Sequence, residues 1–444
     1  MSTDMNRRDF LKIAGLSAAG GLSIFNGCSP KTGNEGMTFR SNPANSDNIS
    51  LLGYGCMRWP KIKDENGNDV VDQETVNKLV DYALEHGINY FDTAPVYHQG
   101  KSEAITAAAL KRHPRESYFI ATKMSNQRSA KPTLEEGISM YENSLNTFET
   151  DHIDYYLLHN LSGKEAFDRR FIENGLMDFL LEERKKGRIR NLGFSFHGQQ
   201  KGFDDLIDLH EKYHWDFVQI QLNYMDWTHA SSRNTNAKYL LGELDKRNIP
   251  AIIMEPLLGG RLAKVPIHIS DRLKERAPQK SVASWAFRFA GTHKNVLCVL
   301  SGMTYMEHLQ DNIGTYSPLR PLTSEDMAFL EQTAEIMQNY PIIDCTDCRY
   351  CMPCPYGIDI PAIFKHYNKC VNEGFISTDK GSKEYRKARR AYLVGYDRSI
   401  PESAQADHCI SCGQCLKECP QGIEIPEKIL NISRYVEDLK KNKF

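Results

Sequence analysis

The cysteines of this chain are concentrated near its C-terminal end. Of the 12 cysteines, nine lie between Cys345 and Cys419, in the last part of a 444-residue chain. A small secreted domain held together by disulfides spreads its cysteines through a short sequence. Crowding of this kind instead predicts a metal-binding module that follows a larger domain.

Two groups of four cysteines define this module, and a proline follows the last cysteine of each group. Two-residue spacings let three thiolates converge on one cubane, and a fourth cysteine before proline turns the chain toward a second cluster. Zinc is the competing metal, but zinc ribbons use two separated Cys-x2-Cys pairs. The spacing therefore favours two [4Fe–4S] clusters, as an electron path or as structural elements. The groups are Cys345, Cys348, Cys351 and Cys354, then Cys409, Cys412, Cys415 and Cys419.

The second group matches the bacterial ferredoxin pattern, in which the last cysteine binds the other cluster. This resemblance implies one cluster on the first three cysteines of group one with Cys419, and another on those of group two with Cys354. The first group has one residue fewer before Cys354, which leaves Cys370 as an alternative ligand. With helices expected over residues 360–373 and 383–394, about residues 341–430 resemble the α-helical ferredoxin domains of respiratory dehydrogenases.

Short apolar runs alternate with amphipathic segments over residues 48–320. Eight strands separated by helices of crossover length predict an α/β fold of the (β/α)8 TIM-barrel type. No Gly-x-Gly-x-x-Gly follows any of these strands, so two doubly wound sheets are the less favoured fold. A helix that bridges to the domain at 341–444 is predicted within 321–340. The expected strands are 51–55, 88–93, 119–123, 153–159, 189–195, 217–223, 251–256 and 296–302.

The N-terminal residues contain a candidate targeting signal. Arg7 and Arg8 precede a short apolar run over residues 13–25, and together they resemble a twin-arginine export signal over residues 1–28. Cys28 is a candidate lipid anchor, and residues 29–47 are expected to form a flexible linker. We therefore expect a periplasmic or membrane-anchored protein; the alternative is a cytoplasmic protein with a chance Arg-Arg pair. The net charge of −2 gives no reason to expect a nucleic-acid partner.

Polar residues end three consecutive expected strands of the barrel. Asp92 ends the second strand and Tyr97 follows it, Lys123 ends the third, and His159 ends the fourth. Taken singly, each residue has a structural explanation. Because active sites of TIM barrels lie at the C-terminal ends of the strands, the four together predict a catalytic site.

This arrangement resembles the aldo-keto reductases over about residues 48–315. The resemblance implies that Tyr97 gives a proton to a carbonyl group that receives hydride from a nicotinamide. Lys123, paired with Asp92, would lower the pKa of Tyr97 toward neutrality. His159 would orient the substrate oxygen by a hydrogen bond.

The same resemblance implies positions for NAD or NADP. Phe196 and Met254 depart from the usual Asn and stacking aromatic, and His308 stands where many members bind the 2′-phosphate with Arg. Glu255 would repel a pyrophosphate unless it points away or is neutralised. The implied cofactor-binding residues are Ser195, Gln219, Met254, Leu257, Gly302, His308 and Asn312.

These patterns together predict an oxidoreductase that interconverts a carbonyl compound, such as an aldehyde, ketone or sugar, and its alcohol. The two clusters would exchange electrons with a redox partner protein or a quinone-linked donor. The alternative is an electron-transfer or scaffold subunit whose barrel is catalytically idle. Export separates the chain from a free nicotinamide pool, which favours a tightly held nucleotide or electron exchange through the clusters.

Overall fold

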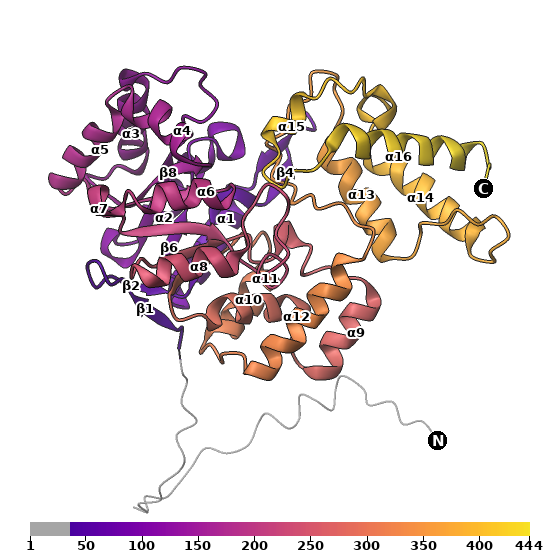
Figure 1. Cartoon of the computed structure of the whole chain (residues 1–444), viewed down its shortest axis with the longest axis horizontal. Coiled ribbons are helices and arrows are strands. Elements are labelled where there is room, and N and C mark those ends of the chain that lie inside the picture. Colours follow the sequence, from indigo (N-terminus) through magenta and orange to yellow (C-terminus); the bar gives the residue numbers. More distant parts are fainter. Residues whose placement is uncertain (1–35) are drawn as a thin grey trace, which may run out of the picture. The chain divides into compact units, whose positions relative to one another are not determined.

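A computed structural model describes residues 36–444 of the protein (Figure 1). The expected export signal over residues 1–28, with the candidate lipid anchor Cys28, lies outside the described residues. Within residues 36–444, no helix has the length and apolar character needed to cross a membrane.

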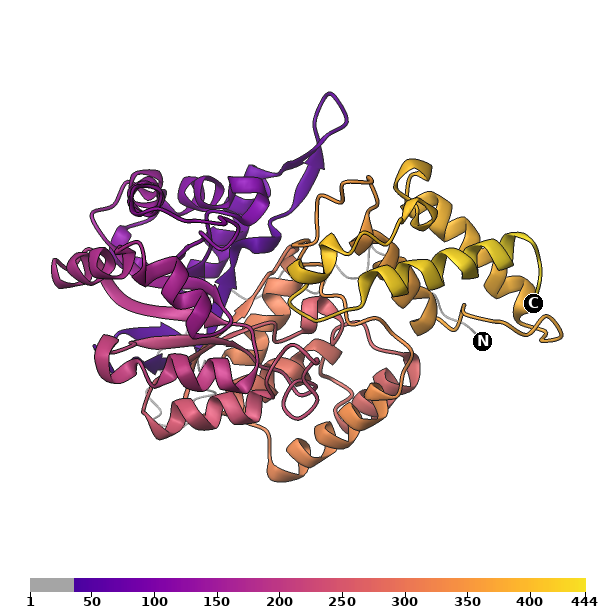
Figure 2. The same ribbon diagram turned by 45° about the horizontal axis from the view of Figure 1, so that its top comes forward.

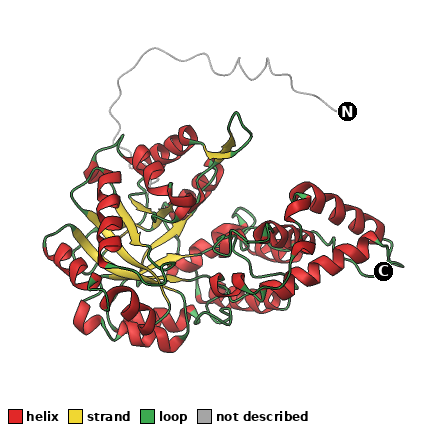
Figure 3. Cartoon of the chain, turned by 90° about the horizontal axis from the view of Figure 1, so that it is seen from above, coloured by secondary structure: helices red, strands yellow, loops and turns green. Residues whose placement is uncertain are grey.

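Eight parallel strands close into a barrel, which confirms the predicted fold class. Each strand pairs with the next one in the chain, and β12 pairs with β3 to close the ring. Figure 3 shows these strands enclosed by helices. Strands buried on both faces have near-continuous apolar sequences, which is why the sequence located all eight. They are β3 (Leu52–Gly55), β6 (Tyr90–Asp92), β7 (Phe119–Met124), β8 (Ile153–Leu161), β9 (Ile189–Phe196), β10 (Phe217–Gln221), β11 (Ala251–Met254) and β12 (Val296–Ser301).

The helices between the strands each bury one apolar face. In the first of them, Val76, Leu79, Val80 and Ala83 recur at helical spacing and are all buried. A capping box formed by Thr133 and Glu136 begins the third one. The helices of the barrel are α1 (Gln73–Glu85), α2 (Ser102–Leu110), α3 (Leu134–Phe148), α4 (Lys164–Phe167), α5 (Leu176–Lys185), α6 (Gln200–Ile207), α7 (His210–Tyr213), α8 (Ala237–Lys246), α9 (Ile267–Arg276), α10 (Val282–Thr292) and α11 (Met306–Tyr316).

The helical segment that follows β8 is interrupted. A π-helical turn covers Asp168–Ile172, and α5 begins only at Leu176. Gly175 separates the two in the left-handed region, with a φ of 74° that favours glycine. The interruption turns the buried Arg170 inward, toward the end of β8.

The N-terminal end of the barrel is covered by a hairpin of β1 (Phe39–Ser41) and β2 (Asn48–Ser50). The prediction of a flexible linker over residues 29–47 is therefore wrong for its described part, residues 36–47. Tyr155 donates to Asp47 Oδ2 (2.9 Å), and Asn42 Nδ2 donates to the Tyr155 hydroxyl (3.1 Å). These polar contacts order a segment whose composition alone resembles a tether.

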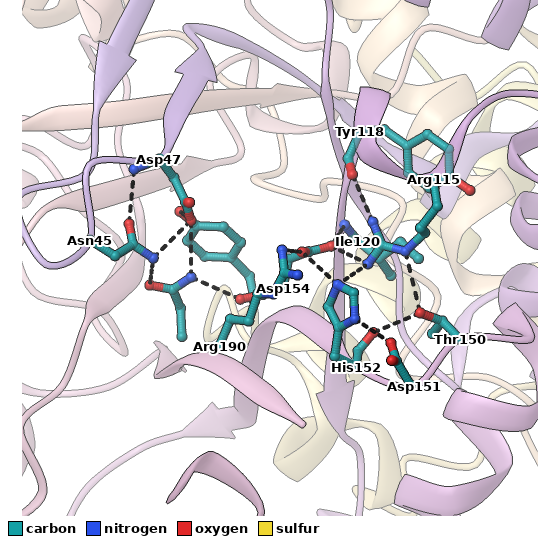
Figure 4. A network of polar contacts seen from close by, with 12 residues as sticks. Asn45, Asp47, Arg115, Tyr118, Ile120, Thr150, Asp151, His152, Asp154 and Arg190 are labelled. Carbon is teal, nitrogen blue, oxygen red and sulfur yellow. Dashed lines mark hydrogen bonds and ion pairs between the residues drawn. The ribbon is translucent and has the colours of Figure 1, made fainter. Parts of the chain in front are cut away.

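An ion-pair network lies at the same end of the barrel (Figure 4). Asp154, near the start of β8, accepts from Arg115 at 2.5 Å, from Arg190 at 3.1 Å and from the backbone N–H of Ile120 at 2.8 Å. Because the N-terminal face of a TIM barrel serves stability rather than catalysis, we assign this network a structural role.

The C-terminal region is mostly helical, as predicted. The bridging helix α12 (Ser324–Gln338) has the expected bounds and begins with a capping box of Thr323 and Asp326. Helices α13, α14 and α16 (orange to yellow in Figure 2) pack together around a separate apolar core that includes Phe364 and Tyr392. These elements are α13 (Ile360–Asn372), α14 (Tyr385–Ser399), α15 (Gln414–Glu418) and α16 (Ile425–Lys440). A further hairpin, β4 (Lys61–Lys63) and β5 (Asp69–Val71), extends from the barrel.

Candidate active site and cluster sites

The C-terminal ends of β6, β7 and β8 bring the four candidate catalytic residues together. Lys123 Nζ donates to Asp92 Oδ1 (2.5 Å) and to the carbonyl oxygen of Thr93 (2.6 Å). The same Nζ lies 4.9 Å from the centre of the Tyr97 ring. The rings of Tyr97 and His159 meet edge to face, with their centres 5.9 Å apart. An acid, a phenol, an amine and an imidazole thus share one end of the barrel.

Residues that the sequence did not single out hold His159 in place. Ser125 Oγ lies 2.6 Å from His159 Nδ1, which leaves Nε2 for a substrate oxygen. Arg170 donates to the backbone oxygen of His159 (2.7 Å) and to Asn126 Oδ1 (2.9 Å). Burial, together with the charges of Lys123 and Arg170, places the pKa of His159 well below its usual value, so its imidazole is neutral at pH 7. Ser125 and Asn126 directly follow β7, so the strand-end rule could have found them.

The structure differs from the prediction for Tyr97. Lys123 was expected to lower the pKa of this phenol, but burial and the charges of Asp92 and Glu255 raise it well above its usual value. The ammonium group of Lys123 pairs with Asp92, as expected, and also donates to the Thr93 carbonyl oxygen. Tyr97 therefore keeps its proton at neutral pH.

The candidate cofactor-binding residues separate into an inner and an outer group. Gln219 Nε2 donates to Asp92 Oδ2 (3.0 Å), and Ser195 Oγ accepts from the backbone N–H of Asn160 (2.7 Å), so both lie at the mouth of the barrel. Asn312 Nδ2 donates to Ser301 Oγ (3.1 Å) near the end of β12. The others lie farther along the surface: Met254, Leu257 and Gly302 are partly buried, and His308 on α11 is exposed.

The loop after β11, which would face the pyrophosphate of a dinucleotide, is covered by protein. Gly259 has a φ of 66°, and a Cβ there would lie 2.2 Å from the backbone oxygen of Thr346. Arg58 donates to that same oxygen at 2.6 Å. Glu255 is half-buried here, and desolvation raises the pKa of its carboxyl group, which favours the neutral form. The residues present thus suit a nicotinamide ring at Ser195 and Gln219, whereas a pyrophosphate at Gly259 requires Thr346 to move.

Four cysteines line one apolar cavity in the C-terminal region. Three come from the first group, and Cys419 comes from the second, together with apolar side chains such as Phe364 and Ile425. This lining matches the exchange of the last cysteine that the ferredoxin pattern implies. Four thiols converging on an apolar pocket fit one cubane. The four cysteines of the cavity are Cys345, Cys348, Cys351 and Cys419.

Cys354 lies near the remaining cysteines of the second group. Burial, followed by the nearby thiols of Cys409, Cys412 and Cys354, raises the pKa of Cys415 to about 11. Cys370, the alternative ligand, is buried elsewhere, with its Sγ 3.5 Å from His366 Nε2. Among residues 36–444, no three His, Cys, Asp or Glu side chains meet closely enough to bind one single ion, but a cubane has a different iron for each thiolate.

Comparison with known proteins agrees with both parts of the chain. A model of the aldo/keto reductase family matches residues 51–335, and a model of the 4Fe-4S dicluster domain matches residues 344–424. The chain therefore belongs to the aldo/keto reductase family and carries a 4Fe–4S dicluster domain in its C-terminal region. It is an oxidoreductase by this membership, and the family implies a nicotinamide cofactor.

Relatives resemble the barrel more than the C-terminal region. The NADH-specific methylglyoxal reductase of Escherichia coli is 22% identical, over 67% of this chain and 98% of its own. L-Galactose dehydrogenase of Arabidopsis thaliana is 23% identical, over 66% and 92%. The probable aldo-keto reductase 1 of Glycine max is 30% identical, but the match spans only 41% of that protein. Among solved structures, aldo-keto reductase AKR11C1 of Bacillus halodurans superimposes with a TM-score of 0.52 at 21% identity, over 67% of this chain and 96% of that one.

Proposed function

We propose that this oxidoreductase interconverts a small carbonyl compound and its alcohol at Tyr97, and that electrons enter or leave the barrel through its two [4Fe–4S] clusters. One observation carries the proposal. The segment that carries Cys345, Cys348 and Cys351 is held against the barrel, where Arg58 donates to the Thr346 backbone oxygen (2.6 Å) and Arg261 pairs with Asp344 (2.7 Å). A cluster site in direct contact with the barrel loops supports an electron path more than a remote structural element.

The roles proposed for the side chains follow from their charges. Tyr97 is protonated at neutral pH and would donate to a carbonyl oxygen as it gains electrons. Neutral His159 would orient that oxygen through Nε2. The ion pair of Lys123 with Asp92 would place a cation beside the oxygen as negative charge develops on it.

A nicotinamide, when bound, supplies or accepts the hydride. We propose that Ser195 and Gln219 hold its carboxamide, with either NAD or NADP as the dinucleotide. Because Thr346 covers Gly259, entry or release requires the cluster-binding segment to move. This contact supports a tightly held nucleotide, which suits a protein outside the cytoplasm.

We also propose that the chain is exported by the twin-arginine route and works in the periplasm, or at the membrane through a lipid on Cys28. The supporting features are Arg7, Arg8 and the apolar run that follows. The clusters would then exchange electrons with a redox partner protein or a quinone-linked donor. Fractionation of cells that express C-terminally tagged protein tests this location, and recovery with the cytoplasm would contradict it.

Replacing Tyr97 with Phe tests the catalytic proposal. We expect turnover of carbonyl substrates to fall by about 10²- to 10⁴-fold, because the proton donor is lost. Anaerobically purified protein should keep the absorbance of both clusters, and mass spectrometry of released nucleotide should identify the dinucleotide. Unchanged turnover in this variant would instead favour the catalytically idle barrel.

A further inference from the structure

Three buried polar side chains form a row between the cavity lined by four cysteines and the interior of the barrel. Gln421, two residues after Cys419, lines that cavity and donates from Nε2 to Gln221 Oε1 (3.2 Å). Gln221, the last residue of β10, donates from its own Nε2 to Asp226 Oδ2 (2.6 Å). Gln421, Gln221 and Asp226 are 5%, 6% and 5% exposed. Two amide side chains therefore separate the cluster site from a buried carboxyl group.

The Asp226 carboxyl group also borders a small cavity on its other side. The cavity wall includes Ala230, Asn234 and Thr235, which are partly exposed. Asn223 Nδ2 donates to Asp226 Oδ2 at 2.6 Å, so this oxygen accepts two hydrogen bonds. The cavity gives a proton a short way from the surface to a carboxyl group that is otherwise enclosed by protein.

Charged groups of neighbouring elements act on Asp226. Arg261, in the loop after β11, pairs with Asp344 (2.7 Å). Glu255 directly follows β11, and its backbone oxygen accepts from Asn223 Nδ2 (3.1 Å). Burial is the largest effect and raises the pKa of Asp226; its two hydrogen bonds and the charge of Arg261 oppose this rise, and Asp344 adds to it. A further negative charge nearby would raise the pKa again.

We infer that Asp226 takes up one proton from solvent when the first cluster, the one in the cavity lined by four cysteines, gains one electron. This inference rests on the proposed function and deepens it, because it adds a proton-accepting residue to the electron path. The electron comes from the redox partner, and the proton binds Asp226 Oδ1, since Oδ2 already accepts two hydrogen bonds. When the electron leaves, the proton returns to solvent. The proton thus compensates a charge added to a buried region, where an unpaired charge is costly.

A redox titration of cluster-loaded, full-length protein tests this coupling. The two cluster potentials are followed by electron paramagnetic resonance between pH 5 and 9, with dithionite as the reductant. We expect one potential of wild type to fall as the pH rises, by up to about 59 mV per pH unit, because a tenfold change in proton concentration is worth that much per electron. In Asp226→Asn, this potential should no longer depend on pH.

Asp216 offers a matched control at the opposite end of the same strand. It directly precedes β10, and burial raises the pKa of its carboxyl group too. Asp216 is bound there by Arg184 (3.0 Å) and by the backbone N–H of Leu192 (2.8 Å), away from the cysteine-lined cavity. Asp216→Asn should therefore leave the pH dependence of both potentials unchanged.

Infrared difference spectra, reduced minus oxidised, follow the proton directly. The carbonyl stretch of a protonated carboxyl group should appear when wild type is reduced, and Asp226→Asn should lack it. If Asp226→Asn does not retain its clusters, Asp226→Glu serves instead, because it keeps a carboxyl group and should shift the band. An absent band, or one that Asp226→Glu does not shift, overturns the inference.

The outcomes separate this inference from the proposed function. Potentials of wild type that do not change with pH overturn the role of Asp226 and leave the proposed function intact. A pH dependence that persists in Asp226→Asn does the same, and Glu255 is then the carboxyl group to replace. Purified protein without reducible clusters overturns the proposed electron path, and this inference with it.

Discussion

At the scale of single residues, the candidate site depends on one buried ion pair. Lys123 and Asp92 have side-chain exposures of 1% and 5%, and the 2.5 Å contact between them is supported by Gln219 and the Thr93 carbonyl oxygen. Removing one partner of such a pair leaves a buried charge without compensation, which costs more than the pair itself contributes. Burial and the charge of Asp92 raise the pKa of Tyr97, so this phenol keeps its proton.

We therefore expect Asp92→Asn to lower the free energy of unfolding by about 3–5 kcal/mol. The measurement is urea denaturation of cluster-loaded protein under anaerobic conditions. Asp69→Asn is the matched control, because Lys63 and Asp69 pair at a similar distance (2.7 Å) while both are exposed. A loss in Asp92→Asn no larger than that of the control would contradict the importance of burial.

At the scale of elements, the start of β8 and the segment 344–351 make contacts at opposite faces of the barrel. Asp154 ties β8 to its neighbours through Arg115 and Arg190 at the N-terminal face of the barrel. The segment 344–351 covers the loop after β11 at the other face. The first contact stabilises the fold, and we propose that the second controls access to the site.

The Asp154 network predicts a pH dependence of stability. Burial alone would raise the pKa of Asp154, but the hydrogen bond from His152 and the charge of Arg115 outweigh it, so the pKa is lowered. A carboxyl group with a lowered folded-state pKa stabilises the fold above its unfolded pKa of about 3.9, and this contribution is lost as the pH falls through the folded value.

Compared with wild type, we expect Asp154→Asn to have a lower free energy of unfolding at pH 7. We also expect this free energy to fall less in the variant as the pH decreases from 6 through the folded-state pKa of Asp154. Thermal unfolding over that pH range measures both effects. Asp245→Asn, at an exposed position of α8, serves as the control. Parallel pH curves for wild type and Asp154→Asn would refute the assignment.

The covering segment makes a prediction about nucleotide exchange. Asp344→Ala removes the partner of Arg261, so the segment should move away from Gly259 more often. Because the pair is partly exposed and contributes about 1 kcal/mol or less, NADH or NADPH should bind and dissociate about three- to fivefold faster. Stopped-flow nucleotide fluorescence measures the rates, with Glu335→Ala on α12 as control. Equal rates would show that this contact does not limit access.

At the scale of the whole molecule, the first cluster joins distant parts of the chain to the barrel. Cys419, the fourth cysteine of the cavity, is far in sequence from the other three. The turn that carries it also contacts the barrel, where Gln421 donates to Gln221 (3.2 Å) and Asn234 donates to the Pro420 backbone oxygen (3.0 Å). Two segments of the C-terminal region therefore anchor the same cluster site beside the mouth of the barrel.

Ligand exchange between the two cysteine groups predicts which cluster each variant loses. Cys419→Ser should impair the cluster beside the barrel, and Cys354→Ser the outer one, so each should hold about half the iron of wild type. Cys419→Ser should retain the outer cluster and still lose electron transfer to the barrel, which none of the other variants should do. Cys370→Ser should keep both clusters. Iron analysis and electron paramagnetic resonance distinguish these variants, and normal iron in Cys354→Ser would contradict the assignment.

The sequence by itself determined the architecture and the candidate chemistry. Continuous apolar runs located the eight strands, because strands buried on both faces need them. Strand ends located Asp92, Lys123 and His159, and cysteine spacing predicted the clusters. These signals depend on residues that are near one another in the chain, so the amino-acid sequence alone is enough to find them.

Only the tertiary structure decided how these parts meet. Residues 36–47 look like a linker, yet Asn42 and Asp47 order them through contacts with β8. The pKa of Tyr97 depends on burial and on Glu255, which lies 158 positions away in the chain. The segment 344–351 has no catalytic signature of its own, and only the fold places it against Arg58, Arg261 and Gly259 of the barrel. Desolvation and long-range contacts arise from packing, so the cysteine motifs predicted two clusters, and only the fold placed three of these cysteines in a segment that contacts the barrel.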